Sequence, residues 1–207
     1  MTCELALTAE SDVGAAAGQL RRALLSAPLA CELHVGDDGS SPESLTPASV
    51  LFPIVRRDAG WFVLLTQRTD HLRDHPGQIS FPGGRVEPED LSPVHTALRE
   101  TQEEIGLSSE HIEVIGFLPD YCTITGYRVT PVVALVTPPF DLSPDAHEVA
   151  QVFEVPFDFL MDPANHQEHV IQRNGRPRKF YAVPYQDYFI WGATAGIILS
   201  LHRALTA

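Results

Sequence analysis

The sequence has few of the residues that hold disulfide-rich or zinc-stapled domains together. Its 207 residues include three cysteines, an odd number without a CxxC pair. That set provides neither a disulfide framework nor a zinc knuckle, so we expect a reducing, cytoplasmic location. The N-terminus has early acidic residues and no basic stretch before an apolar run, which argues against a secretory signal. The apolar run AGIILSL near the C-terminus is too short to span a bilayer.

Positive charge is also scarce, since 14 Lys and Arg stand against 27 Asp and Glu and give a formal charge of −13. Nucleic-acid binders and membrane-surface proteins use clustered Lys and Arg against phosphates, and this chain has no such run. We therefore predict no nucleic-acid partner and no membrane association. An acidic protein can still bind a small phosphate compound when a divalent cation lies between them. The 44% of hydrophobic residues suffices for the core of one domain.

Hydrophobic periodicity and turn residues predict one domain with an N-terminal extension. Residues 1–49 are expected to form a helix and a linker, and residues 50–207 the domain itself. Strands are predicted at 50–56, 61–68, 112–118, 128–137 and 149–155, a hairpin around 174–175, and helices at 11–26, 93–105 and 192–204. This irregular order favours an α+β fold, a mixed α/β sandwich, over a regular doubly wound sheet. Phe189 and Trp191 are expected to pack in the core, with stacking on an adenine as the alternative.

Three glutamates in the predicted helix 93–105 carry the strongest chemical signal. Glu100, Glu103 and Glu104 share one helix face, because residues three and four apart are neighbours. Carboxylates this close repel one another unless a cation lies between them, and Mg²⁺ and Mn²⁺ prefer such oxygen ligands. Arg99 can neutralise or orient one carboxylate through a forked ion pair. A solvated acidic helix face is the alternative interpretation.

A glycine pair upstream of the helix adds a second signal. Gly83 and Gly84 follow Phe81-Pro82, and paired glycines let the backbone approach an ion or a phosphate closely. The carbonyl oxygen of Gly84 is a candidate metal ligand. A tight turn that ends a strand is the alternative.

Together, the glycine pair, the acidic loop and the RExxEExG helix resemble the Nudix box. The general box reads Gly, five residues, Glu, seven residues, then Arg-Glu-apolar-x-Glu-Glu-x-Gly-apolar. Here Asp90 replaces the first Glu, one extra residue precedes Arg99, and Thr101 replaces the apolar residue. The first acid is a structural member of the box, so these departures leave the metal-binding glutamates in place. The resemblance implies the Nudix fold, with a central mixed sheet packed between helices.

The flanking sequence is similar to the coenzyme A pyrophosphatase, or NudL-type, branch of this family. The similar segments are Leu64–Gly84, Thr96–Glu100, Thr125–Pro131, Glu148–Val149 and Phe189–Gly196. The resemblance implies cleavage of the coenzyme A diphosphate into 4′-phosphopantetheine and adenosine 3′,5′-bisphosphate, with acylated or oxidised coenzyme A as further substrates. Hydrolysis of ADP-ribose, NADH or a dinucleotide is an alternative, and so is a non-catalytic Nudix binding module.

The resemblance also implies roles for the box residues. It assigns Mg²⁺ or Mn²⁺ to Glu100 and Glu104, with Glu103 as a ligand or part of the base network and the Gly84 carbonyl as a further ligand. Arg99 and Glu103 are predicted to take part in catalysis.

Residues outside the box complete the predicted site. Glu148 is predicted to act as general base or metal ligand from another loop, and a solvated loop acid is the alternative. Arg68 and Arg73 are predicted to contact the substrate. His71 is spaced for a zinc pair with His75, but the proline that follows His75 disfavours a helix there, so zinc is not expected. Whether the N-terminal helix caps the domain or forms a homodimer is left open.

Overall fold

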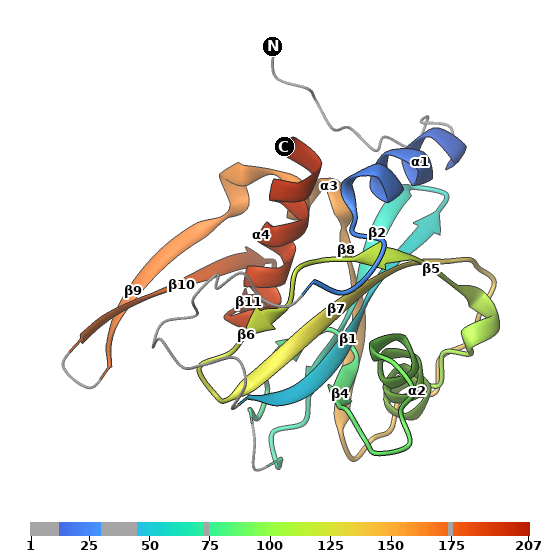
Figure 1. The fold of residues 1–207 in the computed structure, drawn as a ribbon. Coiled ribbons are helices and arrows are strands. Elements are labelled where there is room, and N and C mark those ends of the chain that lie inside the picture. Colours follow the sequence, from blue (N-terminus) through green and yellow to red (C-terminus); the bar gives the residue numbers. More distant parts are fainter. Residues whose placement is uncertain (1–12, 30–44, 73–74, 174–175) are drawn as a thin grey trace.

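A mixed β-sheet forms the centre of the fold in the computed structural model, which describes residues 13–29, 45–72, 75–173 and 176–207. Helix α2 covers one face of this sheet, and α1 and α4 lie on the other (Figure 1). The helices are α1 (Val13–Ala23), α2 (Pro93–Ile105), α3 (Phe157–Met161) and α4 (Ala193–Thr206), with 3-10 turns η2 (Ser109–His111) and η3 (Pro163–Asn165). The strands are β1 (Thr46–Arg57), β2 (Gly60–Arg68), β3 (Ile79–Ser80), β4 (Gly83–Arg85), β5 (Ile112–Phe117), β6 (Tyr121–Cys122), β7 (Tyr127–Val136), β8 (Val149–Pro156), β9 (Gln167–Arg173), β10 (Arg176–Tyr185) and β11 (Tyr188–Trp191).

Strand β1 organises the sheet. It runs parallel to β7 and antiparallel to β2 and β4, while β8 extends the sheet beyond β2 and β5 extends it beyond β7. Its side chains alternate between two apolar layers, as expected for a strand covered on both faces. Leu51 packs with Ala97 of α2, whereas Phe52 packs with Leu20 of α1 and Ile198 of α4. The predicted α+β class and the mixed sheet between helices are therefore confirmed.

Helix α2 has the predicted bounds, and its caps explain why. The Ser92 side chain accepts a hydrogen bond from the His95 N–H, and Pro93 occupies the first turn. Gly106 ends the helix with φ 71°, in the left-handed region, and its N–H donates to the Gln102 carbonyl. Strand β1, by contrast, begins at residue 46 rather than 50, because pairing with β7 extends into the segment interpreted as linker.

A second, three-stranded sheet has the order β11-β10-β9, and the ribbon formed by β9 and β10 projects from the body (Figure 1). The predicted hairpin is thus present, although its turn at 174–175 lies outside the described residues. The expectation that Phe189 and Trp191 pack in the core is wrong: they are 47% and 38% exposed. The alternation of β11 turns Ile190 into the core instead, and that places its two neighbours on the outer face.

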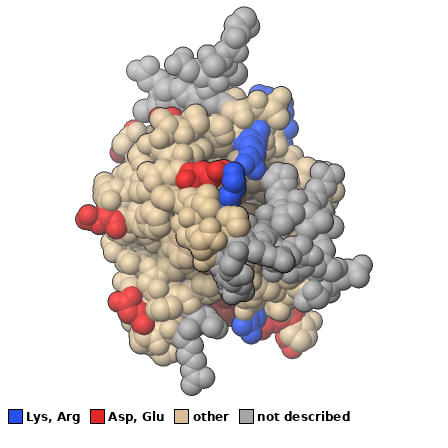
Figure 2. Space-filling view, turned by 90° about the vertical axis from the view of Figure 1, so that its left-hand side faces the viewer, with Lys and Arg blue, Asp and Glu red and all other residues tan. Residues whose placement is uncertain are grey.

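Helix α1 lies against the main core, where Ala16 and Leu20 are buried. Among the described residues, no helix combines the length and apolar character needed to cross a membrane. On the described part of the face in Figure 2, basic side chains form a short strip beside an acidic group, a further basic group lies at the lower edge, and they do not merge into an extended patch.

Candidate active site

Helix α2 carries its three glutamates at different depths. Glu104 faces the sheet with Ala97 and Ile105 and is 5% exposed, whereas Glu103 points away from the sheet and is mostly exposed. Glu100 lies between these extremes. Thr101, which replaces an apolar residue of the box, is also buried, and its hydroxyl donates to the Ala97 carbonyl. The substitution therefore places no unsatisfied hydroxyl in the interior.

Arg99 and Asp90 form a forked ion pair that ties the acidic loop to α2. The Arg99 Nε and Nη2 atoms donate to the two Asp90 oxygens at 3.1 and 3.0 Å, and the Asp90 side chain is 1% exposed. The Thr96 hydroxyl and the Glu87 N–H donate to the same carboxylate. Because the Arg99 guanidinium hydrogen-bonds to it, the pKa of Asp90 is held well below its usual range. Asp90 thus serves as the structural acid of the box despite its shorter side chain.

Arg99 also contacts the glutamates that follow it. Its Nη2 and Nη1 atoms lie 3.0 Å from Glu100 Oε1 and Glu103 Oε2 respectively. The hydrogen bond to Asp90, with a smaller contribution from Glu100, raises the pKa of Arg99, and the ion pairs hold the guanidinium among protein carboxylates. The geometry therefore supports an orienting role, while a direct catalytic role for Arg99 stays a prediction.

The glycine pair lies directly beneath the glutamates. Strand β4 pairs with β1 and brings Gly84 so close to Glu100 that a Cβ there would lie 2.3 Å from the Glu100 Oε1 atom. The Gly83 N–H donates to Glu104 Oε2 at 3.2 Å. Gly84 is thus part of the site because only a residue without a side chain can approach Glu100 this closely. Gly83 lacks a Cβ for a different reason, its close packing against Ser49 and Val50 of β1.

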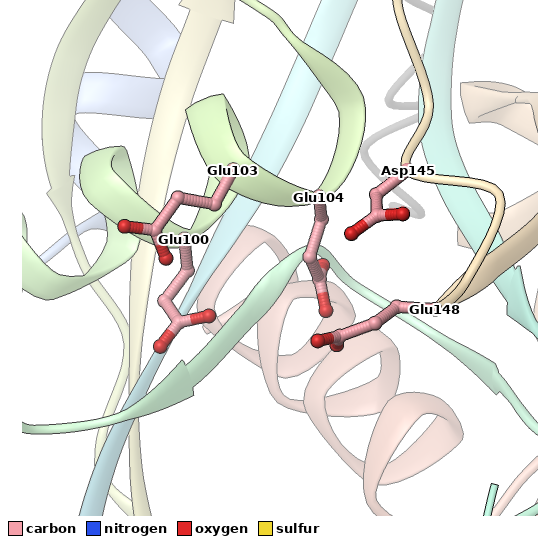
Figure 3. A pocket seen from close by; sticks show the side chains of 5 residues that line it. All are labelled: Glu100, Glu103, Glu104, Asp145 and Glu148. Carbon is pink, nitrogen blue, oxygen red and sulfur yellow. The ribbon is translucent and has the colours of Figure 1, made fainter.

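A second loop faces α2 and completes an acidic pocket. Its five lining residues are Glu100, Glu103 and Glu104 from α2, with Asp145 and Glu148 from the loop before β8 (Figure 3). The Glu104 and Glu148 side chains point toward one another, whereas Glu103 points to the far side of Glu100 (Figure 3). The fold thus brings Glu148 to the box glutamates from more than forty residues further along the chain.

Burial and neighbouring carboxylates disfavour the ionised forms of Glu100 and Glu104. Burial raises the pKa of Glu104 to about 8, opposed by the Gly83 N–H and by Arg68, and Glu100 and Glu148 raise it further. Burial likewise raises the pKa of Glu100, with smaller upward contributions from nearby carboxylates. A divalent cation in the pocket would relieve both effects.

The donor set suits a hard divalent cation, although the side chains must rotate to form its shell. Among the described residues, no three His, Cys, Asp or Glu side chains are already arranged as metal ligands. Glu100 and Glu103 are turned toward Arg99, and Glu104 toward the Gly83 N–H. Carboxylates in one pocket, beside a strand carbonyl, are nevertheless the oxygen ligands that Mg²⁺ and Mn²⁺ prefer.

The other predicted residues have different outcomes. Arg68 ends β2 at the pocket, with Nη1 3.8 Å from Glu104 Oε1. Arg73 lies outside the described residues. His71 contacts His147, with Nε2 3.2 Å from Nδ1.

Asp145 was missed as a residue of the pocket. The sequence offered one signal for Asp145: it lies three residues before Glu148 in the segment DAHE, between a proline-containing stretch and a strand. The structure shows a turn there, in which the Glu148 N–H donates to the Asp145 carbonyl. That turn presents both acids to α2.

Comparisons with known proteins identify the family of this chain. Residues 45–173 match the family described as NUDIX domain. The protein named "Uncharacterized Nudix hydrolase NudL" of Escherichia coli K12 is 44% identical over 154 residues, which cover 74% of this chain and 80% of that protein. Its namesake from Enterobacter sp. strain 638 shows the same identity and coverage.

Solved structures include more distant similarities. A MutT/nudix family protein from Enterococcus faecalis has a TM-score of 0.49 at 18% identity, covering 82% of this chain and 65% of that one. The Nudix hydrolase RenU of M. smegmatis has a TM-score of 0.47 at 24% identity, covering 55% and 71%. Family membership rests on the sequence matches: this chain is a Nudix hydrolase, a member of a pyrophosphohydrolase family and a relative of NudL.

Proposed function

We propose that this Nudix hydrolase cleaves the diphosphate bond of coenzyme A, releasing 4′-phosphopantetheine and adenosine 3′,5′-bisphosphate. Acylated and oxidised coenzyme A are further candidate substrates. The observation that carries the proposal is the position of the segment resembling the coenzyme A branch. Its first part ends β2 with Arg68 beside Glu104, and its last part donates the Gly83 N–H to the same carboxylate. Two residues of this segment, Arg68 and Gly83, therefore contact a glutamate of the pocket, which supports the proposal.

The pocket residues have distinct tasks in such a reaction. Glu100 and Glu104 would hold Mg²⁺ or Mn²⁺, with Glu103 and the Gly84 carbonyl as further candidate ligands. The bound ion would neutralise charge on the diphosphate and lower the pKa of an attacking water. Glu148 faces Glu104 across the pocket and is the candidate general base or additional ligand.

The proposal also includes the basic residues that bind the substrate and the compartment of the protein. Arg68, and Arg73 by its position in the sequence, are candidates for binding the substrate phosphates, including the 3′-phosphate. Nucleic acid is not proposed as a partner. A reducing, cytoplasmic location, expected from three cysteines without a CxxC pair, is part of the proposal.

A substrate panel with product identification tests the proposal. Purified protein with Mg²⁺ or Mn²⁺ is incubated with coenzyme A, acetyl-coenzyme A, coenzyme A disulfide, ADP-ribose, NADH and a diadenosine polyphosphate, and products are identified by mass spectrometry. The highest kcat/KM is expected for a coenzyme A form. A higher value for ADP-ribose, NADH or the dinucleotide would overturn the substrate assignment, and no hydrolysis of any compound would favour a binding module.

Three variants test the metal assignment. Glu103→Gln and Glu104→Gln should each lower turnover by orders of magnitude, because each removes a negative ligand or base without changing side-chain volume much. Glu110→Gln is the matched control, since Glu110 is an exposed acid in η2 outside the pocket. Wild-type rates in both pocket variants would refute the roles assigned to these glutamates.

A further inference from the structure

The segment that carries Asp145 and Glu148, called here the acid loop (residues 143–148), is attached to the end of α2. The Ser143 N–H donates to the Ile105 carbonyl at 2.8 Å, and the Asp145 N–H donates to the Glu104 carbonyl at 2.9 Å. These bonds use carbonyls that the helix leaves without intrahelical partners at its C-terminus. One side of the acid loop is therefore fixed to the helix that carries the box glutamates.

The other side of the acid loop is attached to the residue that follows β2. The Thr69 N–H donates to the Glu148 carbonyl at 3.0 Å, and the Thr69 hydroxyl donates to the His147 carbonyl at 2.8 Å. Thr69 is 7% exposed, and its hydroxyl bond to the exposed residue His147 is partly buried. Any residue except proline can donate the backbone N–H hydrogen bond to the Glu148 carbonyl, whereas the hydrogen bond to the His147 carbonyl needs a side-chain hydroxyl. The Thr69 side chain thus restrains the peptide that precedes Glu148.

A break in strand pairing brings these groups together. Strands β2 and β8 pair regularly up to Gln67 opposite Gln151, but the next pair is Arg68 opposite Val149. Residue 150 of β8 therefore has no opposite residue in β2. Such a bulge bends a strand end and re-aims the neighbouring side chains, and bulges are frequent next to active sites. Here it brings the acid loop to Thr69, while the preceding residue, Arg68, reaches Glu104.

We propose that Thr69 is a positioning residue for Glu148: its hydroxyl holds the acid loop so that the Glu148 carboxylate faces Glu104 across the pocket (Figure 3). Thr69 itself contacts neither the metal nor the substrate in this proposal. The inference rests on the proposed diphosphatase function, because it assumes that Glu148 acts in the reaction.

Substitutions that keep or remove the hydroxyl test this role. Thr69→Val has nearly the same shape but leaves the His147 carbonyl without its donor, and we expect kcat to fall by about 10- to 100-fold, with KM within about threefold of wild type. Thr69→Ser keeps the hydroxyl and should restore kcat to within about threefold of wild type. Thr69→Ala replaces the valine variant if that one fails to fold. Thr194→Val is the matched control, because Thr194 is 6% exposed and donates to the Ile79 carbonyl at 2.9 Å, away from the acid loop.

A double-mutant cycle separates positioning from general damage. If Thr69 acts through Glu148, Thr69→Val should lower kcat by less than about twofold in a Glu148→Gln background. The proposal is overturned by a full additional loss in that background, by a serine variant as slow as the valine variant, or by an equal loss of kcat in Thr194→Val. Wild-type kcat in Thr69→Val, or in Glu148→Gln, overturns it as well.

A readout without turnover distinguishes this inference from the proposed function. Hydrogen exchange of the backbone amides in the acid loop should be faster in Thr69→Val than in wild type and close to wild type in Thr69→Ser. If the wild-type protein cleaves no diphosphate but the two variants show this pattern of exchange, the proposed function is contradicted and the restraint by Thr69 still holds. Unchanged exchange in the valine variant contradicts the restraint itself.

Discussion

Replacement of Gly84 by alanine isolates the contact between β4 and Glu100, one of the glutamates proposed to bind the metal. A Cβ at this position would lie 2.3 Å from Glu100 Oε1 and 2.4 Å from its Cδ. Gly84 is not among the glycines with positive φ, so the backbone itself can accept alanine. The obstacle is the end of a flexible glutamate side chain, which can swing away. Gly84→Ala should therefore disturb the site far more than the fold.

The size of the effect follows from the displacement. To reach an ordinary contact distance of 3.4 Å, the Glu100 carboxylate must move by about 1.1 Å. A misplacement of about 1 Å in a catalytic group costs on the order of 100-fold in rate, or about 2.7 kcal/mol of transition-state stabilisation. The free energy of unfolding should change by less than about 1 kcal/mol, because the added methyl meets only a movable side chain and alanine reduces the entropy of the unfolded chain.

The assay combines steady-state hydrolysis, Mn²⁺ binding by calorimetry and denaturant unfolding. Gly84→Ala should lower kcat about 100-fold and weaken Mn²⁺ binding, with a nearly unchanged unfolding midpoint. Gly18→Ala is the control, since Gly18 lies inside α1, where a Cβ meets Arg22 at 3.4 Å, and the change should stabilise the protein by about 0.5–1 kcal/mol without affecting kcat. A kcat within threefold of wild type and unchanged Mn²⁺ affinity in Gly84→Ala would refute the reasoning.

Three further predictions concern the same framework. The pKa of Glu104, about 8 in the fold against an ordinary 4.5, means that the metal-free protein is most stable below about pH 4.5 with respect to this group. It loses about 5 kcal/mol as the pH rises from about 4.5 to 8. Denaturant unfolding in chelator should show this loss and show less of it in Glu104→Gln; equal slopes in both proteins would contradict it. Asp90→Ala should lower the free energy of unfolding by about 3–5 kcal/mol, because it leaves the Arg99 guanidinium without its buried partner, and an unchanged unfolding midpoint would contradict that pairing. Gly106→Ala should cost about 1 kcal/mol at φ 71° and lower kcat about tenfold, because its Cβ would lie 2.9 Å from the Ser143 side chain and displace the acid loop; wild-type kcat would show that the loop tolerates the shift.

The helix of the Nudix box could be predicted from the sequence because its features depend on neighbouring residues. The bounds of α2 follow from Ser92, Pro93 and Gly106, whose capping and turn preferences act over a few residues. The shared face of the box glutamates likewise follows from helical spacing alone. The structural role of Asp90 came only from the family resemblance, and its partners across the acidic loop became visible only in the fold.

Contacts between distant segments were harder to predict. Asp145 was missed because no local rule says which surface loop faces α2. The first residues of β1 were interpreted as linker because their strand pairing depends on β7, some eighty residues away. Phe189 and Trp191 were expected in the core because aromatic side chains usually pack there, and a four-residue strand is too short for its alternation to indicate which face is covered.

The sequence by itself determined the family, the helix that bears Glu100, Glu103 and Glu104, and the proximity of a glycine pair to them, since each depends on residues close together in the chain. Only the tertiary structure decided that Glu148 and Asp145 join those glutamates and that Arg68 reaches Glu104 while Thr69 holds the acid loop. The physical reason is that these contacts arise from strand register, including the bulge between β2 and β8. Register is set by the packing of the whole sheet and not by the preferences of neighbouring residues.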